Sequence, residues 1–111
     1  MVDVAVYSSK IIITKRNKTI FVPINKILYI ERINQCSYIV CKHDLIPVRT
    51  SLKYFESILP SNFVRAHRSF IINKSFLKEL NKQDNNNFIA EFYNVETKTL
   101  VSKCQLENLF W

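Results

Sequence analysis

The cation-capable residues Arg65, His67 and Arg68 lie within four positions of one another, at the start of the segment RAHRSFIIN. Arginine can bind guanine O6 and N7, or a phosphate, through two parallel N–H donors, and serine hydroxyls are common phosphate donors. The cluster straddles a break between two apolar segments, so some of its side chains can reach outward. These residue types indicate nucleic-acid recognition. For His67, a half-buried histidine that holds the loop by a hydrogen bond is an equal alternative.

The remaining residues do not assemble a catalytic or metal-binding set. Catalysis requires a base, a nucleophile and an orienting group, or paired carboxylates, whereas the nine acidic residues are scattered and nothing marks Cys104 or His67 as activated. The chain has no glycine for a loop that cradles a nucleotide. Its three cysteines form no CxxC pair, and Cys41 is expected to be a small buried hydrophobe. We predict no enzyme, no metal, no cofactor and no small-molecule substrate.

The net charge of +7 is concentrated in the first two thirds of the chain. Residues 1–41 carry six Lys/Arg and two acidic residues, a balance of +4. Residues 42–78 carry seven and two (+5), and residues 79–111 carry three and five (−2). A basic field of this kind attracts nucleic acid or an anionic membrane surface. Solubility alone is the simpler alternative.

Length and hydropathy indicate a single domain over residues 1–111. Hydrophobic residues make up 48% of the chain, which is enough for a modest core. No apolar run approaches the roughly 18 residues of a membrane span, and the first ten residues lack the pattern of a signal peptide. An odd number of cysteines also argues against a secreted disulfide scaffold. We therefore expect a soluble, cytoplasmic protein with no membrane partner.

Short segments rich in β-branched and aromatic residues alternate with asparagine-containing turns. Asparagine tolerates left-handed backbone better than other residues with a Cβ, so it stands where glycine is absent. Many short strands at close spacing predict a mostly β fold of antiparallel strands in packed sheets. The expected strands are Lys10–Thr14, Thr19–Val22, Ile27–Ile33, Ser37–Cys41, Leu45–Val48, Phe63–Ala66, Phe70–Ile72, Leu77–Leu80, Phe88–Phe92 and Thr97–Val101.

Two segments depart from the strand pattern. In TSLKYFESILP, apolar residues fall at helical spacing behind a Thr50 or Ser51 cap, and Pro60 ends the run, so one short amphipathic helix is predicted between strands. A second short helix is predicted in KCQLENLFW, which places Leu106, Leu109 and Phe110 on one side. The apolar end, Phe110-Trp111, is expected to pack on the sheet or to serve an interface.

Three blocks in order make up most of the chain: VPINKILYIERINQCSYIVC, VRTSLKYFESILPSNFVRAHRSFIINKSFLKEL and LVSKCQLENLF. Residues 63–73 fit the pattern F-x-R-x-H-R-S-[FY]-[IV]-[IV]-N at all nine of its specified positions. Leu28–Glu31 and the helix start at Ser51-Leu52 add support. From about Ile11 to its end, the sequence resembles the LytTR family of DNA-binding domains.

The resemblance implies a LytTR-like fold and sequence-specific binding of double-stranded DNA. Such domains are typically output halves of bacterial two-component response regulators, AgrA-like ones among them, and they regulate transcription. They read DNA with loops in successive major grooves, commonly at paired direct repeats near promoters, and they bend the duplex. The implied partners are double-stranded DNA and, on DNA, a second copy of the chain. Free-standing regulator and output domain of a longer chain both stay open.

By the same resemblance, one DNA-contacting site lies at a loop and another lies before the last helix. The first is the loop Arg32–Tyr38, whose candidates for base edges are Asn34, Gln35 and Ser37. Asparagine and glutamine side chains suit adenine. In the second, Ser102 and Lys103 stand where many relatives show Ser-Arg. Lysine lacks the two-pronged donor of arginine, so Lys103 is expected to anchor a phosphate.

The basic motif supplies the remaining site. We expect Arg68 to make the main groove contact, Arg65 and Ser69 to hold phosphates, and His67 to position the loop. Asn73 is expected to be a turn former that ends the strand.

Other basic residues carry weaker expectations. Arg49 and Lys53 flank the helix start and are expected to contact the DNA backbone, with a solvated helix face as the alternative. Lys15, Arg16 and Lys18 are expected to decorate a hairpin turn.

Two other functions are compatible with the sequence. An RNA-binding module would need exposed aromatic platforms, for which Tyr38 and Phe70 are the candidates. A basic protein-interaction domain would use its apolar strands and Phe110-Trp111, with the charge serving solubility.

Overall fold

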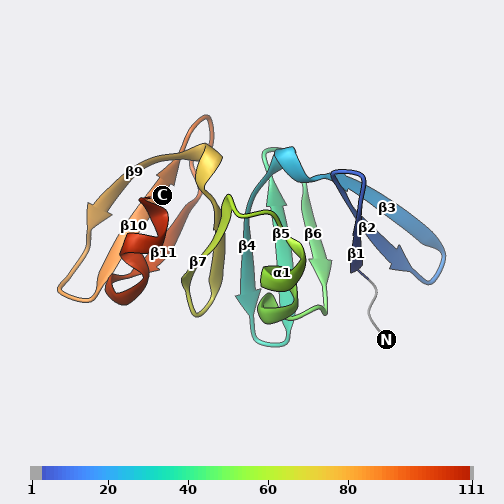
Figure 1. Cartoon of the computed structure of the whole chain (residues 1–111), viewed down its shortest axis with the longest axis horizontal. Helices are drawn as coiled ribbons and strands as arrows, with labels where there is room; N and C mark the ends of the chain where they lie inside the picture. The colour runs from blue at the N-terminus through green and yellow to red at the C-terminus, as the bar shows by residue number, and fades with distance from the viewer. Residues whose placement is uncertain (1–3, 111) are drawn as a thin grey trace.

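Three antiparallel sheets lie side by side along the long axis of the molecule in the computed structural model, which describes residues 4–110 (Figure 1). Its overall dimensions are 45 × 26 × 23 Å. The first sheet has the order β1-β2-β3, from Val4–Tyr7, Lys10–Lys15 and Lys18–Pro23. The central sheet has the order β6-β5-β4-β8-β7, from Leu45–Val48, Cys36–Cys41, Ile27–Ile33, Phe70–Asn73 and Phe63–His67. The third has the order β11-β10-β9, from Lys98–Ser102, Asn87–Phe92 and Leu77–Lys82. The predicted mostly β, antiparallel fold is confirmed.

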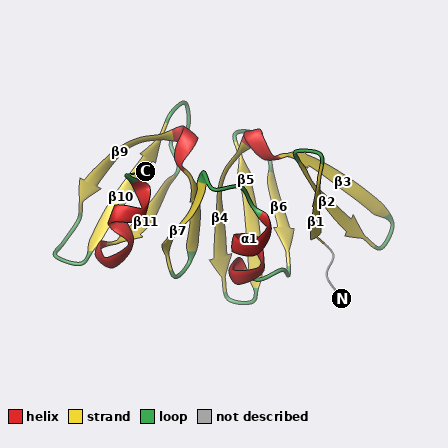
Figure 2. Ribbon diagram, viewed as in Figure 1, coloured by secondary structure: helices red, strands yellow, loops and turns green. Residues whose placement is uncertain are grey.

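Short helical segments join the strands (Figure 2). The helix α1 spans Leu52–Ile58, and the Ser51 hydroxyl accepts a hydrogen bond of 3.2 Å from the Tyr54 N–H, which confirms Ser51 as the cap. Residues 4–110 also contain three 3-10 segments: η1 (Ile24–Lys26), η2 (Lys74–Phe76) and η3 (Lys103–Leu109).

The C-terminal helix forms as η3, but the expected packing of its last residues is only partly correct. Leu109 is buried and Leu106 half-buried, as the pattern required. Phe110 was expected on the same side and is instead 61% exposed, because η3 turns by three residues rather than 3.6 and rotates it away from the sheet. Trp111 lies outside the described residues.

One strand was not predicted. β1 pairs with β2 through the two-residue turn Ser8-Ser9, in which both residues have positive φ, 51° and 62°. Serine is a weak signal for such a turn, so the sequence pattern did not predict this hairpin. Asparagine does occupy left-handed backbone at Asn34 (φ 56°) and Asn94 (φ 66°), as expected in a chain without glycine.

Two hydrophobic cores occupy opposite faces of the central sheet, because alternate residues of a strand point to opposite sides. On one face, Ile30, Ile39 and Ile71 pack with the first sheet and α1. On the other face, Tyr29 and Ile72 pack with the third sheet and η3. The central sheet is therefore the element on which both end sheets depend.

Asn73 does more than end a strand. Its side chain is 1% exposed, donates from Nδ2 to the Ile27 carbonyl (2.8 Å), and accepts at Oδ1 from the Ser75 N–H (2.9 Å) and from Asn62 Nδ2 (2.9 Å). It also caps η2. One buried amide thereby joins β4, β8 and the segment before β7.

We predict that Asn73→Ala lowers the free energy of unfolding by about 2–3 kcal/mol, because it leaves buried polar groups without partners. Denaturant unfolding measures the change, with Asn25→Ala in η1, an exposed position, as the control. Equal stability of the Asn73 and Asn25 variants would contradict the proposed network.

Candidate nucleic-acid interface

Antiparallel pairing brings several polar connections to one edge of the central sheet. β4 ends where β5 and β8 begin, and β6 and β7 end at that same edge. Figure 1 shows the β4–β5 and β7–β8 turns side by side at the lower edge of the sheet. A direct hydrogen bond links them, from the Arg32 N–H to the Ser69 carbonyl (2.8 Å). We call this the turn edge, made by residues 32–37, 49–51 and 67–69.

Asn34 and Gln35 form the exposed tip of the β4–β5 turn. The left-handed backbone of Asn34 closes this turn. Both amide side chains present donors and acceptors to solvent, which is what a base edge requires.

Ser37 was expected at a base edge and is instead fully buried. Its hydroxyl accepts from Arg32 NH1 (2.8 Å) and donates to the Thr50 carbonyl (2.5 Å). Because it is the first inward-facing residue of β5 after the turn, it cannot reach DNA in this structure. Its contacts give it a supporting role beneath Asn34 and Gln35.

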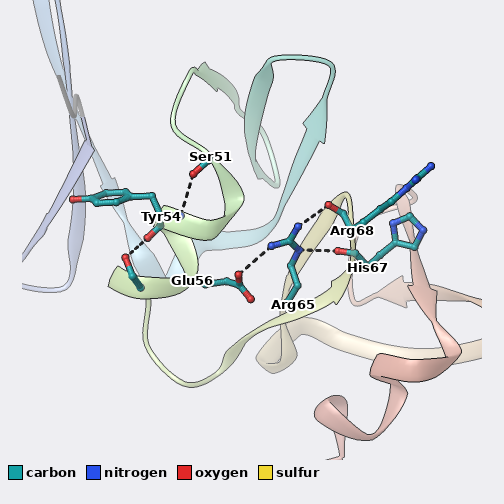
Figure 3. Close-up of polar contacts among 7 residues, drawn as sticks. Ser51, Tyr54, Glu56, Arg65, His67 and Arg68 are labelled. Carbon is teal, nitrogen blue, oxygen red and sulfur yellow. Dashed lines mark hydrogen bonds and ion pairs between the residues drawn. The ribbon is translucent and has the colours of Figure 1, made fainter.

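Arg65 was expected to hold a phosphate, and the structure shows its guanidinium engaged with protein on three sides (Figure 3). Nε donates to the His67 carbonyl (2.9 Å), NH2 to the Arg68 carbonyl (2.8 Å), and NH1 to Glu56 Oε2 in α1 (3.0 Å). Arg65 pairs with Ile71 of β8 and directly precedes the bulge at Ala66, and its guanidinium reaches the carbonyls of the following turn. These contacts make it an organiser of the β7–β8 turn.

His67 positions the same turn, because its Nδ1 accepts from the Ser69 N–H (3.1 Å). That contact requires an unprotonated Nδ1. Burial lowers the pKa of His67 below its ordinary value of 6.5, and the charges of Arg68 and Arg65 lower it further. Its ring also packs edge-on against Phe70, with centroids 5.8 Å apart.

Arg68 is the exposed member of the motif, and its side chain extends away from Arg65 and α1 (Figure 3). Ser69 beside it is half-buried, with its backbone N–H and carbonyl used by His67 and Arg32. The β7–β8 turn therefore presents the exposed guanidinium of Arg68 on a backbone that is hydrogen-bonded to Arg65, His67 and Arg32.

The site expected before the last helix lies at the start of η3. Ser102 is half-buried at the end of β11, Lys103 is exposed, and the Lys103 N–H donates to the Asn86 carbonyl (2.9 Å) in the β9–β10 turn. η3 packs against β7, which carries Arg65 and His67. Lys103 therefore lies where β11 of the third sheet ends and η3 begins.

Arg49 and Lys53 are both exposed, the first between β6 and α1 and the second on α1. Phe70, in contrast, is buried against Tyr29, with ring centroids 6.0 Å apart, and offers no platform for a base. Within residues 4–110, no three His, Cys, Asp or Glu side chains are grouped so that they could hold a metal ion. In that same range, no helix is long and apolar enough to cross a membrane.

Comparison with known proteins identifies relatives that match most of this chain. A family model described as the LytTr DNA-binding domain matches residues 17–110. A solved LytTr DNA-binding domain from Bacillus cereus superposes with a TM-score of 0.77 at 27% identity, covering 91% of this chain and 93% of the other.

Two curated relatives are transcriptional regulatory proteins. YpdB of Escherichia coli O6:H1 is 26% identical over 97 residues, which cover 86% of this chain and 39% of YpdB. NatR of Bacillus subtilis is 26% identical over 101 residues, which cover 90% of this chain and 43% of NatR. The chain thus spans about two fifths of the length of these relatives.

We predict that Arg65→Gln lowers the free energy of unfolding by about 1–2 kcal/mol, because two turn carbonyls lose their donors. Glu56→Gln, which removes only the exposed ion pair, should cost less than about 1 kcal/mol. Denaturant unfolding compares the two variants. Equal losses would show that the ion pair, rather than the carbonyl contacts, holds the turn.

We further predict a pH dependence of stability that originates at His67. Because its folded-state pKa is lowered, the unfolded chain binds this proton more tightly. The free energy of unfolding therefore falls as the pH drops through 6.5 toward the folded-state pKa, and His67 has no such effect well above 6.5.

Unfolding of the His67→Asn variant across this pH range tests the prediction, since asparagine keeps an acceptor but does not titrate. His43→Asn in the β5–β6 turn is the control. An unchanged pH profile in His67→Asn would assign the effect to other groups.

Proposed function

The chain belongs to the family of LytTr DNA-binding domains, and on that basis we propose that it reads double-stranded DNA by inserting its turn edge into the major groove. The observation that carries the proposal is the β7–β8 turn. Arg68 projects from it into solvent, while Arg65 and His67 hold its backbone. An exposed arginine on a fixed backbone loses little freedom when it contacts a guanine edge.

Asn34 and Gln35 are proposed as the second set of base contacts. They project from the neighbouring turn of the same edge and suit adenine through paired donors and acceptors. Ser37 and Arg32 are proposed to act beneath them, as supports that keep the tip in place.

Lys103, Arg49 and Lys53 are proposed as phosphate anchors. They are exposed at different points of the molecule, Lys103 at the end of the third sheet, Arg49 just before α1 and Lys53 on α1. Ser69 and Ser102 are half-buried. They are proposed to contact the DNA backbone next to Arg68 and Lys103, respectively. Such contacts position a protein on DNA without reading sequence.

The dimensions of the molecule support contacts with successive grooves. Its long axis of 45 Å exceeds one turn of B-DNA, about 34–36 Å. The β4–β5 and β7–β8 turns lie at one edge of the central sheet, and the β11–η3 junction lies at the end of a strand of the third sheet, which is next along that axis (Figure 1). Separate parts of the molecule can therefore meet major grooves one helical turn apart.

We propose that the DNA-binding activity serves bacterial transcription regulation, since YpdB and NatR are described as transcriptional regulatory proteins. Binding at paired direct repeats near promoters, with a second copy of the chain on the DNA, is part of the same proposal. The RNA-binding alternative is not favoured, because Phe70 is buried and Tyr38 is half-buried in the core.

Arg68→Ala is expected to weaken binding to a specific duplex by about 1–3 kcal/mol and to relax preference at one base pair. Lys103→Ala should weaken all duplexes alike and reduce the slope of log affinity against log salt by about 1. Fluorescence anisotropy at several salt concentrations, first on selected and then on random duplexes, separates the two effects. Lys42→Ala in the opposite β5–β6 turn is the control. Specific binding by Arg68→Ala that equals the parent's would overturn the assignment.

A further inference from the structure

A groove lies between the end of β2 and the turn edge. It has a volume of about 640 Å³, and the apolar part of its lining, called its floor below, consists of Ile13, Pro47 and Val48. Thr14, Lys15, Arg16, Cys36 and Arg49 complete its lining. Its two walls come from different sheets, since residues 13–16 belong to the first sheet and its β2–β3 turn, while Cys36 and Pro47 belong to the central sheet.

The groove is lined by three cationic residues, Lys15, Arg16 and Arg49, and none of the described residues that line it is acidic. Lys15 is committed to the protein, because its Nζ donates to the Pro47 carbonyl (2.8 Å) and thereby ties the β2–β3 hairpin to β6. Arg16 and Arg49 are both exposed. One lysine thus fixes the two walls, and two guanidinium groups remain available on opposite sides.

The groove is continuous with the first base-reading turn. Cys36, which lines it, follows Asn34 and Gln35 directly. Arg49 belongs to the turn edge, and its carbonyl accepts from Arg32 NH1 (3.1 Å). In Figure 1 the β2–β3 turn lies at the right end of the molecule, in its lower half, and the β4–β5 turn lies below the central sheet. A DNA strand that leaves the β4–β5 turn sideways would pass over this groove.

We propose that this groove binds the sugar-phosphate backbone next to the base pairs read by Asn34 and Gln35, with Arg16 and Arg49 as the phosphate ligands. The apolar floor suits deoxyribose, and guanidinium groups match phosphate oxygens through paired donors. The β2–β3 turn then becomes a fourth DNA-contacting element rather than a decorated hairpin. The inference rests on the proposed function, and it extends the bound duplex beyond the central sheet.

The test compares the whole chain with the Arg16→Gln, Arg49→Gln double variant. Each phosphate contact contributes about 0.9 to the slope of log affinity against log salt. The double variant should therefore lose about 1.8 from that slope. Hydroxyl-radical footprinting should show lost protection only on the backbone flanking the base pairs of the β4–β5 turn.

The matched control is the double variant Lys26→Gln, Lys42→Gln. It also removes two positive charges, but at η1 and the β5–β6 turn. It should leave both slope and footprint as in the parent. Thermal unfolding confirms that each variant is folded. Arg68→Ala in parallel should change base preference while keeping the flanking protection.

The outcomes separate this inference from the proposed function. If the parent chain binds no duplex, the proposed function fails. If the parent binds but the double variant keeps its slope and its flanking protection, the groove assignment fails and the proposed function stands. Titration with inorganic pyrophosphate tests whether the groove instead binds a free phosphate compound. If pyrophosphate binds tightly to the parent and not to the double variant, while both proteins give the same DNA footprint, the assignment of the groove to DNA is also overturned.

Discussion

The hydrogen bonds of Arg32 hold together the separate connections that make up the turn edge. Its guanidinium NH1 contacts the Ser37 hydroxyl and the carbonyls of Arg49 and Thr50, and its backbone N–H reaches the Ser69 carbonyl. The partners come from the start of β5, the β6–α1 junction and the β7–β8 turn. These groups are far apart in sequence, so no local rule fixes their relative position. Without the guanidinium, partly buried acceptors would lose their donor, and the edge would lose its shape.

The cationic residues in and around the turn edge and the adjoining groove divide into two functional groups. Arg32, Arg65 and Lys15 donate to backbone carbonyls and use their charge to fix turns and hairpins. Arg68, Arg16 and Arg49 are exposed. Residues of the first group give the second a rigid base, which is how a small β fold can present arginines at defined positions. Net charge alone does not distinguish the two groups.

The local parts of this structure could be predicted from sequence, and the long-range parts could not. Ten of the strands and the Ser51 cap follow from β-branched runs, asparagine turns and helical spacing, all of which are local. β1 was missed because a Ser-Ser turn carries a weak signal. For the candidate site, the motif indicates a segment of the chain but not which of its side chains face inward. Ser37 is buried by contact with Thr50, and Arg65 is engaged by Glu56, and neither partner is visible in a linear pattern.

The two cores on opposite faces of the central sheet have a consequence for cooperativity. Each end sheet is stabilised by its own core, so either one can open locally while the other face of the central sheet stays buried. We therefore expect two subglobal folding units that share the five strands of the central sheet. A duplex lying along the long axis would touch both units at once. Binding would then penalise opening at both ends, and amide exchange would slow in segments that never approach the DNA.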